Sequence, residues 1–231
     1  MAPTSGILSE IRSTSLEPAG PSGLLACPRS IQPGPGQYLL ATSPSTAEVL
    51  PTPLFPAALP AEELQLASPL PPGWTAGMVL FLRGPLGKGF SLPRAARKVA
   101  LVAMNCTPAY LQPLAFLALN QGAAVALHCA DTPSGLPSEV EILPIDQLPG
   151  SIAWADFLAA VFPLSSLVAF RRAAGLSIHQ GLPLPGQALV LTPLPCAGTA
   201  DCGLCAVPTP HGWKLACADG PVFDLNLLEL L

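Results

Sequence analysis

The sequence CAGTADCGLCAVPTPHGWKLAC, which runs from Cys196 to Cys217, gathers four of the seven cysteines of this 231-residue chain. Cys202 and Cys205 lie inside it, so the spacing is C-x5-C-x2-C-x11-C. Thiols this concentrated are typical of a soft metal centre or of disulfide bonds. We therefore interpret the rest of the chain around this cysteine segment, residues 196–217.

The composition indicates which partners the protein has. Half of the residues are hydrophobic and 10% are charged, whereas about 25% are charged in a typical soluble domain. So apolar a surface predicts a protein partner. The formal net charge is -4, with only ten Lys and Arg residues, which leaves no basic patch for a nucleic-acid backbone. We therefore expect no nucleic-acid binding.

The apolar character does not extend to a membrane-spanning segment, which needs about 20 consecutive apolar residues. The best window, residues 152–170, is interrupted by Asp156 and Pro163. Residues 1–12 also lack the basic region and apolar run of a secretory signal. The sequence thus predicts a cytoplasmic protein, where thiols stay reduced and clustered cysteines are more often metal ligands than disulfides.

The N-terminal part, residues 1–94, is rich in proline, which lacks a backbone N–H and favours short, interrupted strands over helices. Four extended stretches are expected, at residues 6–14, 36–42, 63–67 and 78–82. A small β-barrel or sandwich fits this pattern.

A glycine-rich turn, RGPLGKGF at residues 83–90, ends this part of the chain. Glycines so closely spaced allow the backbone to approach a ligand or another domain. The candidate contact residues are Gly84, Pro85, Leu86, Gly87 and Gly89.

The pattern of apolar residues changes at Lys98, and residues 95–186 predict a Rossmann-like α/β domain. A strand at 99–103, a helix at 108–121 and a strand at 123–129 form the unit of a parallel sheet. A dinucleotide site would carry glycines in the turn after the first strand. The turn AMNCTP at 103–108 has none, so we expect Thr107 to cap the helix with Pro108 at its first position.

Four further elements are expected downstream. Residues 139–143 alternate like a strand, 151–162 and 164–173 have helical character with Pro163 between them, and 187–191 predict a strand leading to Cys196. The last part, residues 187–231, is then a cysteine-rich module.

The cysteine segment suits an iron-sulfur centre, which needs thiolates on a loop that can wrap the inorganic core. Gly198 and Gly203 can adopt positive φ values there. Cys202 and Cys205, at C-x2-C spacing, could hold one metal ion together, and Cys196 and Cys217 complete a set of four. Plant-type [2Fe-2S] proteins use C-x4-C-x2-C, one residue fewer in the first gap.

Alternatives remain open at this point. Structural zinc sites with four cysteines usually show two C-x2-C pairs, and this chain has one. A disulfide pair and a ligand role for His211, which we expect in a hairpin turn, are the other options. Cys27, Cys106 and Cys129 have the surroundings of small buried hydrophobes. No Ser-His-Asp set or carboxylate pair is evident, so no catalytic residue is predicted and an enzyme activity of its own is uncertain.

Several motifs resemble one family. Residues 201–207 (DCGLCAV) and 212–223 (GWKLACADGPVF) are similar to the iron-sulfur domain of the electron-transfer subunit of dihydroorotate dehydrogenase. The run DGPVF at 219–223 is its most specific marker. PGQY at 35–38 and GPLGKGF at 84–90 also resemble that family and follow in the same order, so the likeness spans most of the chain.

This resemblance implies a ferredoxin-reductase-like protein with an FAD-binding β-barrel (1–94), a nucleotide-binding α/β domain (95–186) and a [2Fe-2S] domain (187–231). Cys196, Cys202, Cys205 and Cys217 would be the cluster ligands. In the family, NADH reduces FAD, and electrons pass through the cluster to a flavin in a catalytic partner subunit of pyrimidine biosynthesis. A hetero-oligomer is thus implied, and the 84–89 turn would contact FAD or form a domain interface.

The chain departs from the family in two places. The barrel motif with arginine and serine should fall near residues 49–56, where this chain reads VLPTPLFP. The glycine-rich nicotinamide loop is replaced by residues 103–108. The sequence therefore argues against NAD(P) more than against FAD. It leaves two versions of the protein: a flavoprotein that couples NAD(P)H to a partner, or a cluster-only electron carrier. A zinc-stabilised interaction protein without redox activity is the alternative from another class.

Overall fold

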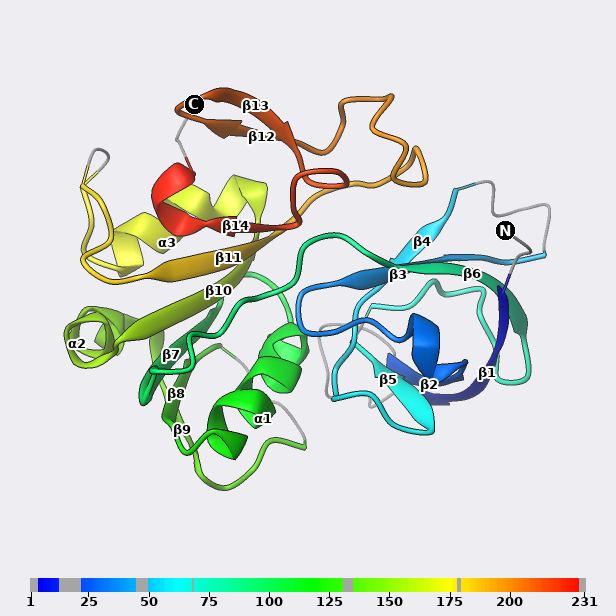
Figure 1. Cartoon of the computed structure of the whole chain (residues 1–231), viewed down its shortest axis with the longest axis horizontal. Helices are drawn as coiled ribbons and strands as arrows, with labels where there is room; N and C mark the ends of the chain where they lie inside the picture. Colours follow the sequence, from blue (N-terminus) through cyan, green and yellow to red (C-terminus); the bar gives the residue numbers. More distant parts are fainter. Residues whose placement is uncertain are drawn as a thin grey trace.

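The computed structural model describes residues 4–12, 22–44, 50–67, 69–130, 135–177 and 180–228. Figure 1 shows two lobes, an antiparallel sheet built from the N-terminal part of the chain and an α/β lobe built from the rest. The two lobes confirm the predicted order of a β domain followed by a Rossmann-like domain.

The N-terminal lobe is a curled six-stranded sheet with strand order β4-β3-β6-β1-β2-β5. Its strands are β1 (Thr4–Arg12), β2 (Ser22–Ala26), β3 (Tyr38–Thr42), β4 (Thr52–Leu54), β5 (Glu63–Leu66) and β6 (Val79–Leu86), and a short 3₁₀ helix, η1 (Arg29–Ile31), precedes β3. The two edges meet where Ala67 N–H donates to Phe55 O (2.9 Å) and Ala57 N–H donates to Gln65 O (2.8 Å). The sheet is therefore a curled, barrel-like antiparallel structure, as expected.

Strands β1, β3, β5 and β6 lie where the sequence predicted them. Strands β2 and β4 were missed because they are short and contain Gly23 and Pro53, residues that are depleted in strands. Pro53 is tolerated because β4 is an edge strand of the sheet.

The second lobe is a six-stranded sheet of order β14-β11-β10-β7-β8-β9, parallel except for β14. Its strands are β7 (Lys98–Ala103), β8 (Ala124–His128), β9 (Val140–Leu143), β10 (Phe157–Pro163), β11 (Gly186–Leu191) and β14 (Val222–Asp224). Its helices are η2 (Pro108–Leu111), α1 (Gln112–Asn120), η3 (Ile145–Gln147), α2 (Leu148–Trp154), η4 (Leu164–Ser166), α3 (Leu167–Ala173) and η5 (Leu225–Leu227).

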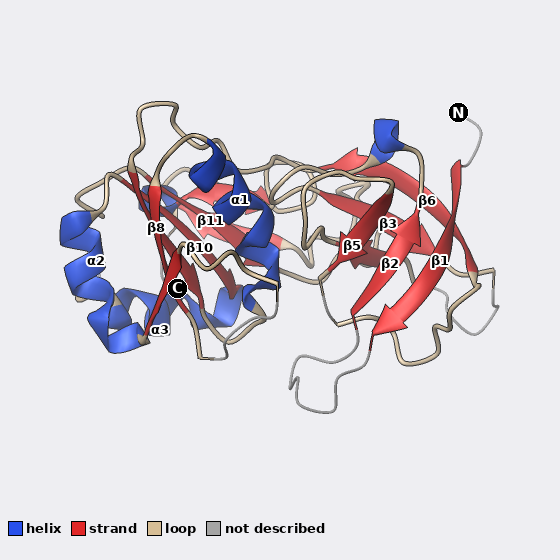
Figure 2. Ribbon diagram, turned by 90° about the horizontal axis from the view of Figure 1, so that it is seen from below, coloured by secondary structure: helices blue, strands red, loops and turns tan. Residues whose placement is uncertain are grey.

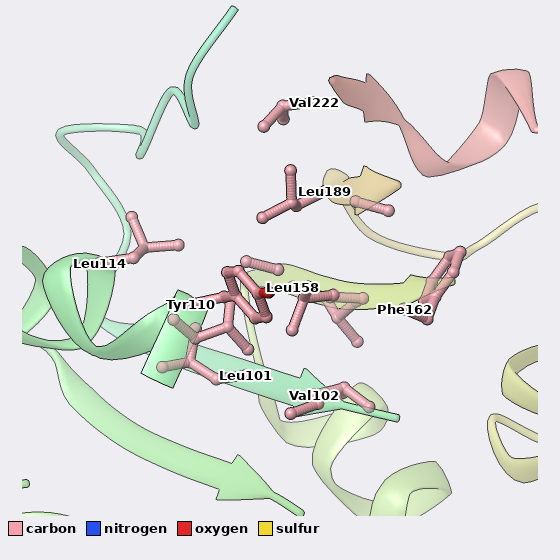
Figure 3. Close-up of a cluster of buried hydrophobic side chains, with 14 of the residues drawn as sticks. Leu101, Val102, Tyr110, Leu114, Leu158, Phe162, Leu189 and Val222 are labelled. Atoms are coloured by element: carbon pink, nitrogen blue, oxygen red, sulfur yellow. The ribbon is translucent and has the colours of Figure 1, made fainter. Parts of the chain in front are cut away.

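The helices cover both faces of this sheet. In Figure 2, α1 lies on one face, and α2 and α3 lie on the opposite one. The turn before α1 has the predicted cap, because Ala109 N–H donates to Thr107 Oγ1 (3.3 Å) and Pro108 opens η2. Figure 3 shows the core between sheet and helices, where Leu101, Tyr110 and Leu158 pack together.

The helix predicted at residues 151–162 is wrong in its second half. Helix α2 ends at Trp154, and Phe157–Pro163 is the strand β10 between β7 and β11. A strand covered on both faces reads as a continuous apolar run, and such a run lacks the alternation that would separate it from a buried helix.

The cysteine segment leaves and re-enters this sheet. It begins after β11, forms the hairpin of β12 (Ala206–Thr209) and β13 (Gly212–Leu215), and returns through β14. His211 lies in the hairpin turn, as expected. The division predicted between residues 186 and 187 passes through β11, which serves both the sheet and the cysteine segment, so the separate 187–231 domain stays a prediction.

The described residues include no helix that is long and apolar enough to cross a membrane.

Candidate metal centre

The four clustered cysteines are held by strands of different sheets. Cys196 follows β11, Cys202 and Cys205 precede β12, and Cys217 follows β13. Cys205 and Cys217 are buried, Cys196 is half-buried and Cys202 is exposed. The segment therefore has a buried side toward the protein and an open side at Cys202.

The thiols form two pairs. The Cys205 Sγ donates to the Cys217 Sγ at 3.4 Å, and Cys196 is hydrogen-bonded to the thiol and backbone of Cys202. A disulfide has a sulfur–sulfur distance of about 2.05 Å, so the buried pair consists of free thiols. That Cys202 and Cys205 hold one metal ion together, as their spacing allows, stays a prediction.

The two pairs differ in their tendency to ionise. Burial by itself would raise the pKa of Cys196, but hydrogen bonds from Cys202, Thr199 and the Ala200 backbone lower it to about 6. Burial and the neighbouring Cys205 thiol raise the pKa of Cys217 to about 12. Cys196 thus favours the thiolate, whereas Cys217 keeps its proton until a cation replaces it.

The loop that carries Cys196 and Cys202 has an unusual backbone. Gly198 and Gly203 adopt φ values of 72° and 69°, as predicted, and Ala197 and Ala200 also have positive φ values, 53° and 67°. Left-handed backbone is uncommon for alanine and is maintained only where the surroundings determine it. Such loops can turn successive N–H groups toward an anionic centre.

The glycine-rich turn of the barrel lies against this loop. Lys88 N–H donates to Gly220 O (2.6 Å), and the Arg83 guanidinium donates to Ala197 O (2.5 Å). A β-carbon at Gly87 would collide with Pro221 and approach the Tyr38 ring. Of the predicted residues Gly84, Pro85, Leu86, Gly87 and Gly89, Gly87 lies against Gly220 and Pro221, whereas Gly84 and Gly89 face Leu39 and Pro35 of the barrel itself. Contact of these residues with FAD stays a prediction.

Tyr38 of β3 lies between the glycine-rich turn at Gly87 and the loop at Gly198. Its side chain is fully buried, its ring packs on Phe55 with centroids 5.5 Å apart, and its hydroxyl has no hydrogen-bond partner. Burial and the nearby Cys217 and Cys205 raise the pKa of Tyr38 to about 12. Sequence reasoning missed Tyr38 and Arg83 as neighbours of the thiols, because nothing in the sequence shows that strands β3 and β6 pack against the cysteine segment.

The turn at residues 103–108, where a dinucleotide-binding domain would carry glycines, lies at the end of the sheet where α/β proteins bind ligands. Met104 N–H donates to Val161 O (3.0 Å), the Cys106 thiol donates to the same oxygen (3.5 Å), and Asn105 Nδ2 donates to Ser166 Oγ (2.9 Å). These bonds join the loops after β7 and β10, at the point where the strand order reverses. With no glycine in the turn as well, these residues do not fit a dinucleotide.

An aromatic contact occupies the boundary between the lobes, where cofactors often bind. Phe55, which follows β4, packs on Tyr38 and also edge-on against Tyr110 of η2, with centroids 5.3 Å apart. All three side chains are buried. Phe55 belongs to the 49–56 stretch, which lacks the expected arginine and serine, so Phe55, Tyr38 and Tyr110 present an apolar contact here, and residues 49–56 supply no cationic side chain for a pyrophosphate.

Comparisons with known proteins agree with this arrangement. Residues 197–229 match the iron-sulfur cluster binding domain of dihydroorotate dehydrogenase B, a stretch that includes Cys202, Cys205 and Cys217 and begins just after Cys196. A search of curated proteins gave no significant match.

Solved structures that resemble the chain include several reductases. The structure of an NADH-dependent reduced ferredoxin-NADP oxidoreductase aligns with 99% of this chain and 90% of its own, at 16% identity and a TM-score of 0.76. The ferredoxin reductase in carbazole 1,9a-dioxygenase covers 76% of this chain and 67% of its own (16% identity, TM-score 0.59). Ferredoxin-NADP+ reductase from Plasmodium falciparum covers 75% and 88% (9% identity, TM-score 0.53).

At these identities, the structural similarity establishes the fold and not the activity. It accounts for both lobes, and the family match accounts for the cysteine segment. The chain therefore has the ferredoxin-reductase-like fold, and its residues 197–229 belong to the iron-sulfur cluster binding domains of the dihydroorotate dehydrogenase B type.

Proposed function

We propose that this protein is an electron-transfer subunit that relays electrons to or from a partner oxidoreductase of the dihydroorotate dehydrogenase type. Its redox centre is a [2Fe-2S] cluster on Cys196, Cys202, Cys205 and Cys217. The observation that carries the proposal is the grouping of these four thiols in and immediately before residues 197–229, which match an iron-sulfur cluster binding domain.

The pairwise arrangement supports a two-iron cluster over a zinc ion. A [2Fe-2S] core offers two irons, each bound by two protein thiolates, and the cysteine segment presents two thiol pairs. A structural zinc ion needs four ligands around one point.

The exposure of the site supports a role in transfer between proteins. A bound [2Fe-2S] cluster supplies one-electron chemistry. The Cys205–Cys217 pair is shielded by the protein, whereas Cys202 reaches the surface. Leu204 and Trp213, in the same segment, are 63% and 60% exposed, so the cysteine segment also presents apolar side chains to a partner. These features suit contact with a catalytic subunit in a hetero-oligomer, and the cytoplasmic location stays a prediction.

The flavin separates two versions of this function. The reductase fold over almost the whole chain favours bound FAD, and the apolar boundary around Phe55 disfavours it. We propose the version in which the cluster is the sole redox centre of this chain. A flavin spectrum that NADH bleaches would replace it with the reductase version.

The test is a visible absorption spectrum of anaerobically purified protein, together with iron, sulfide, zinc and flavin analysis. We expect iron and sulfide in equal amounts, about two of each per chain. A colourless preparation that contains zinc without iron or sulfide would refute the redox function.

Two cysteine variants sharpen the test. Cys202→Ser should abolish the cluster spectrum, because a cluster with three thiolates is poorly held. Cys27→Ser, a half-buried cysteine of the barrel, should leave iron and sulfide content unchanged. If Cys202→Ser retains the full spectrum, Cys202 is not a ligand.

A further inference from the structure

The hydroxyl of Tyr38 is the one feature near the thiols that the cluster proposal does not use. Within the described residues, it is one of three buried side-chain polar atoms with no hydrogen-bond partner. Its residue has no exposed surface. Leaving a buried hydroxyl unpaired costs about 1–3 kcal/mol, and phenylalanine would fill the same space without that cost. A buried unsatisfied group in a native protein therefore calls for an explanation.

The position of this hydroxyl points to the cysteine segment. A β-carbon built on Gly198 would lie 3.6 Å from Tyr38 Oη, so the hydroxyl lies directly against the loop between Cys196 and Cys202. Thiolate charge on Cys217, Cys205 or Cys196 would raise the pKa of Tyr38, and the nearby Arg83 guanidinium opposes this effect. The hydroxyl therefore lies beside the loop that joins two of the proposed cluster ligands.

The ring cannot easily turn its hydroxyl elsewhere. Its face packs on Phe55 at a centroid distance of 5.5 Å. On its edge, a β-carbon at Gly87 would come within 3.0 Å of Tyr38 Cε1, so the glycine leaves the space that the ring occupies. The barrel therefore holds the hydroxyl in one orientation, against the loop between Cys196 and Cys202.

We infer that Tyr38 is a positioning residue of the redox centre, whose O–H donates a hydrogen bond to a sulfur atom of the assembled cluster. This inference rests on the proposed function. The proton stays on the tyrosine oxygen, and the tyrosine is not oxidised or reduced. Because the reduced cluster carries one more negative charge, a hydrogen bond to sulfur stabilises it more than the oxidised cluster and raises the reduction potential.

The experiment compares the wild type with Tyr38→Phe and Tyr110→Phe after reconstitution with ferrous iron and sulfide. Tyr110 is the matched control, since it is a buried tyrosine at the other end of the same aromatic contact. We expect equal iron and sulfide contents, a midpoint potential shifted to a more negative value in Tyr38→Phe, and no shift in Tyr110→Phe. Resonance Raman spectra in H₂O and D₂O should show a smaller isotope shift of the iron–sulfur bands in Tyr38→Phe.

Unfolding of the metal-free proteins separates this role from a purely structural one. With no partner for the hydroxyl, metal-free Tyr38→Phe should be at least as stable as the wild type. Unchanged potential and isotope shifts in a fully loaded Tyr38→Phe variant would overturn the inference and leave the proposed function intact. A wild type that takes up no iron and sulfide would overturn both.

Discussion

Replacing Gly87 by alanine should weaken the contact between the barrel and the cysteine segment. Gly87 has a φ of 77°, and left-handed backbone costs a residue with a β-carbon roughly 1–2 kcal/mol. The new methyl group would also collide with Pro221 and lie 3.0 Å from Gly220 O and 3.0 Å from Tyr38 Cε1. Overpacking of this kind costs about 1–3 kcal/mol, so the expected total is roughly 2–5 kcal/mol.

The chain offers a control with the same backbone strain. Gly77 has a φ of 87°, and a β-carbon there would meet no atom within 4 Å. Gly77→Ala should therefore lose only the backbone part, about 1–2 kcal/mol. The difference between the two variants measures the collision at the interface. The assay is urea unfolding of the metal-free proteins, followed by far-ultraviolet circular dichroism.

Cluster retention provides a second readout. The Gly87 carbonyl accepts a hydrogen bond from Gln37 Nε2 (3.1 Å), and Lys88 N–H donates to Gly220 O, so a shift of this turn reaches Gly220, three residues after Cys217. Gly87→Ala should lose iron to a chelator faster than Gly77→Ala. Equal stability and equal iron loss in the two variants would refute the view that this turn supports the metal site.

Two further predictions concern the α/β lobe. His128 is fully buried, with Nδ1 bonded to Pro144 O and Nε2 to Ser151 Oγ, both at 2.9 Å, and burial lowers its pKa below 6.5 although Asp146 and Glu141 oppose the shift. As the pH falls, the unfolded chain binds a proton at His128 before the folded protein does, so the contribution of His128 to stability should be complete above about pH 6.5 and fall as the pH drops toward the folded-state pKa. Urea unfolding at several pH values should show that the stability of His128→Gln depends less on pH than that of the wild type. An equal pH dependence in the two proteins would contradict the assignment to His128. Thr107→Ala should lower the free energy of unfolding by about 1 kcal/mol, because it removes the side-chain cap at Ala109 N. Thr107→Ser keeps the hydroxyl and should recover most of this loss in thermal unfolding. Equal stability of Thr107→Ala and the wild type would show that the cap contributes nothing.

The sequence predicted those elements whose pattern is local. The alternation of β6 and the strand–helix–strand unit around α1 follow from periodicities of two and 3.6 residues. Thr107 and Pro108 mark the start of η2 by their side-chain chemistry. Strand β10 was mistaken for a helix, because burial on both faces removes the polar residues that reveal the period.

The neighbours of the site depend on contacts between distant parts of the chain. Tyr38 and Arg83 reach the cysteine segment because β3 and β6 pair in the barrel, and the turn after β6 bonds to Gly220. Short motifs carry no information about such packing. The turn at residues 103–108 differs in this respect, because its lack of glycine can be read from the sequence. Without glycine, the backbone cannot approach a dinucleotide closely.

The contact between Cys205 and Cys217 is a feature that spacing alone does not predict. A C-x2-C pair is close in sequence, so Cys202 and Cys205 seemed natural partners. In the structure, Cys205 precedes β12 and Cys217 follows β13, and the hairpin register carries the chain back, with Ala206 opposite Leu215 and Ala216 N–H donating to Cys205 O (2.9 Å).

The backbone hydrogen bonds of the β12–β13 hairpin hold Cys205 and Cys217 next to each other before any metal binds. Cys196 and Cys202, in contrast, are held by a loop with positive φ values at Ala197 and Ala200. One half of the site is therefore set by strand pairing and the other by a strained loop. Metal binding should order the loop that carries Cys196 and Cys202 more than the hairpin, because the backbone of the hairpin is already held by regular hydrogen bonds.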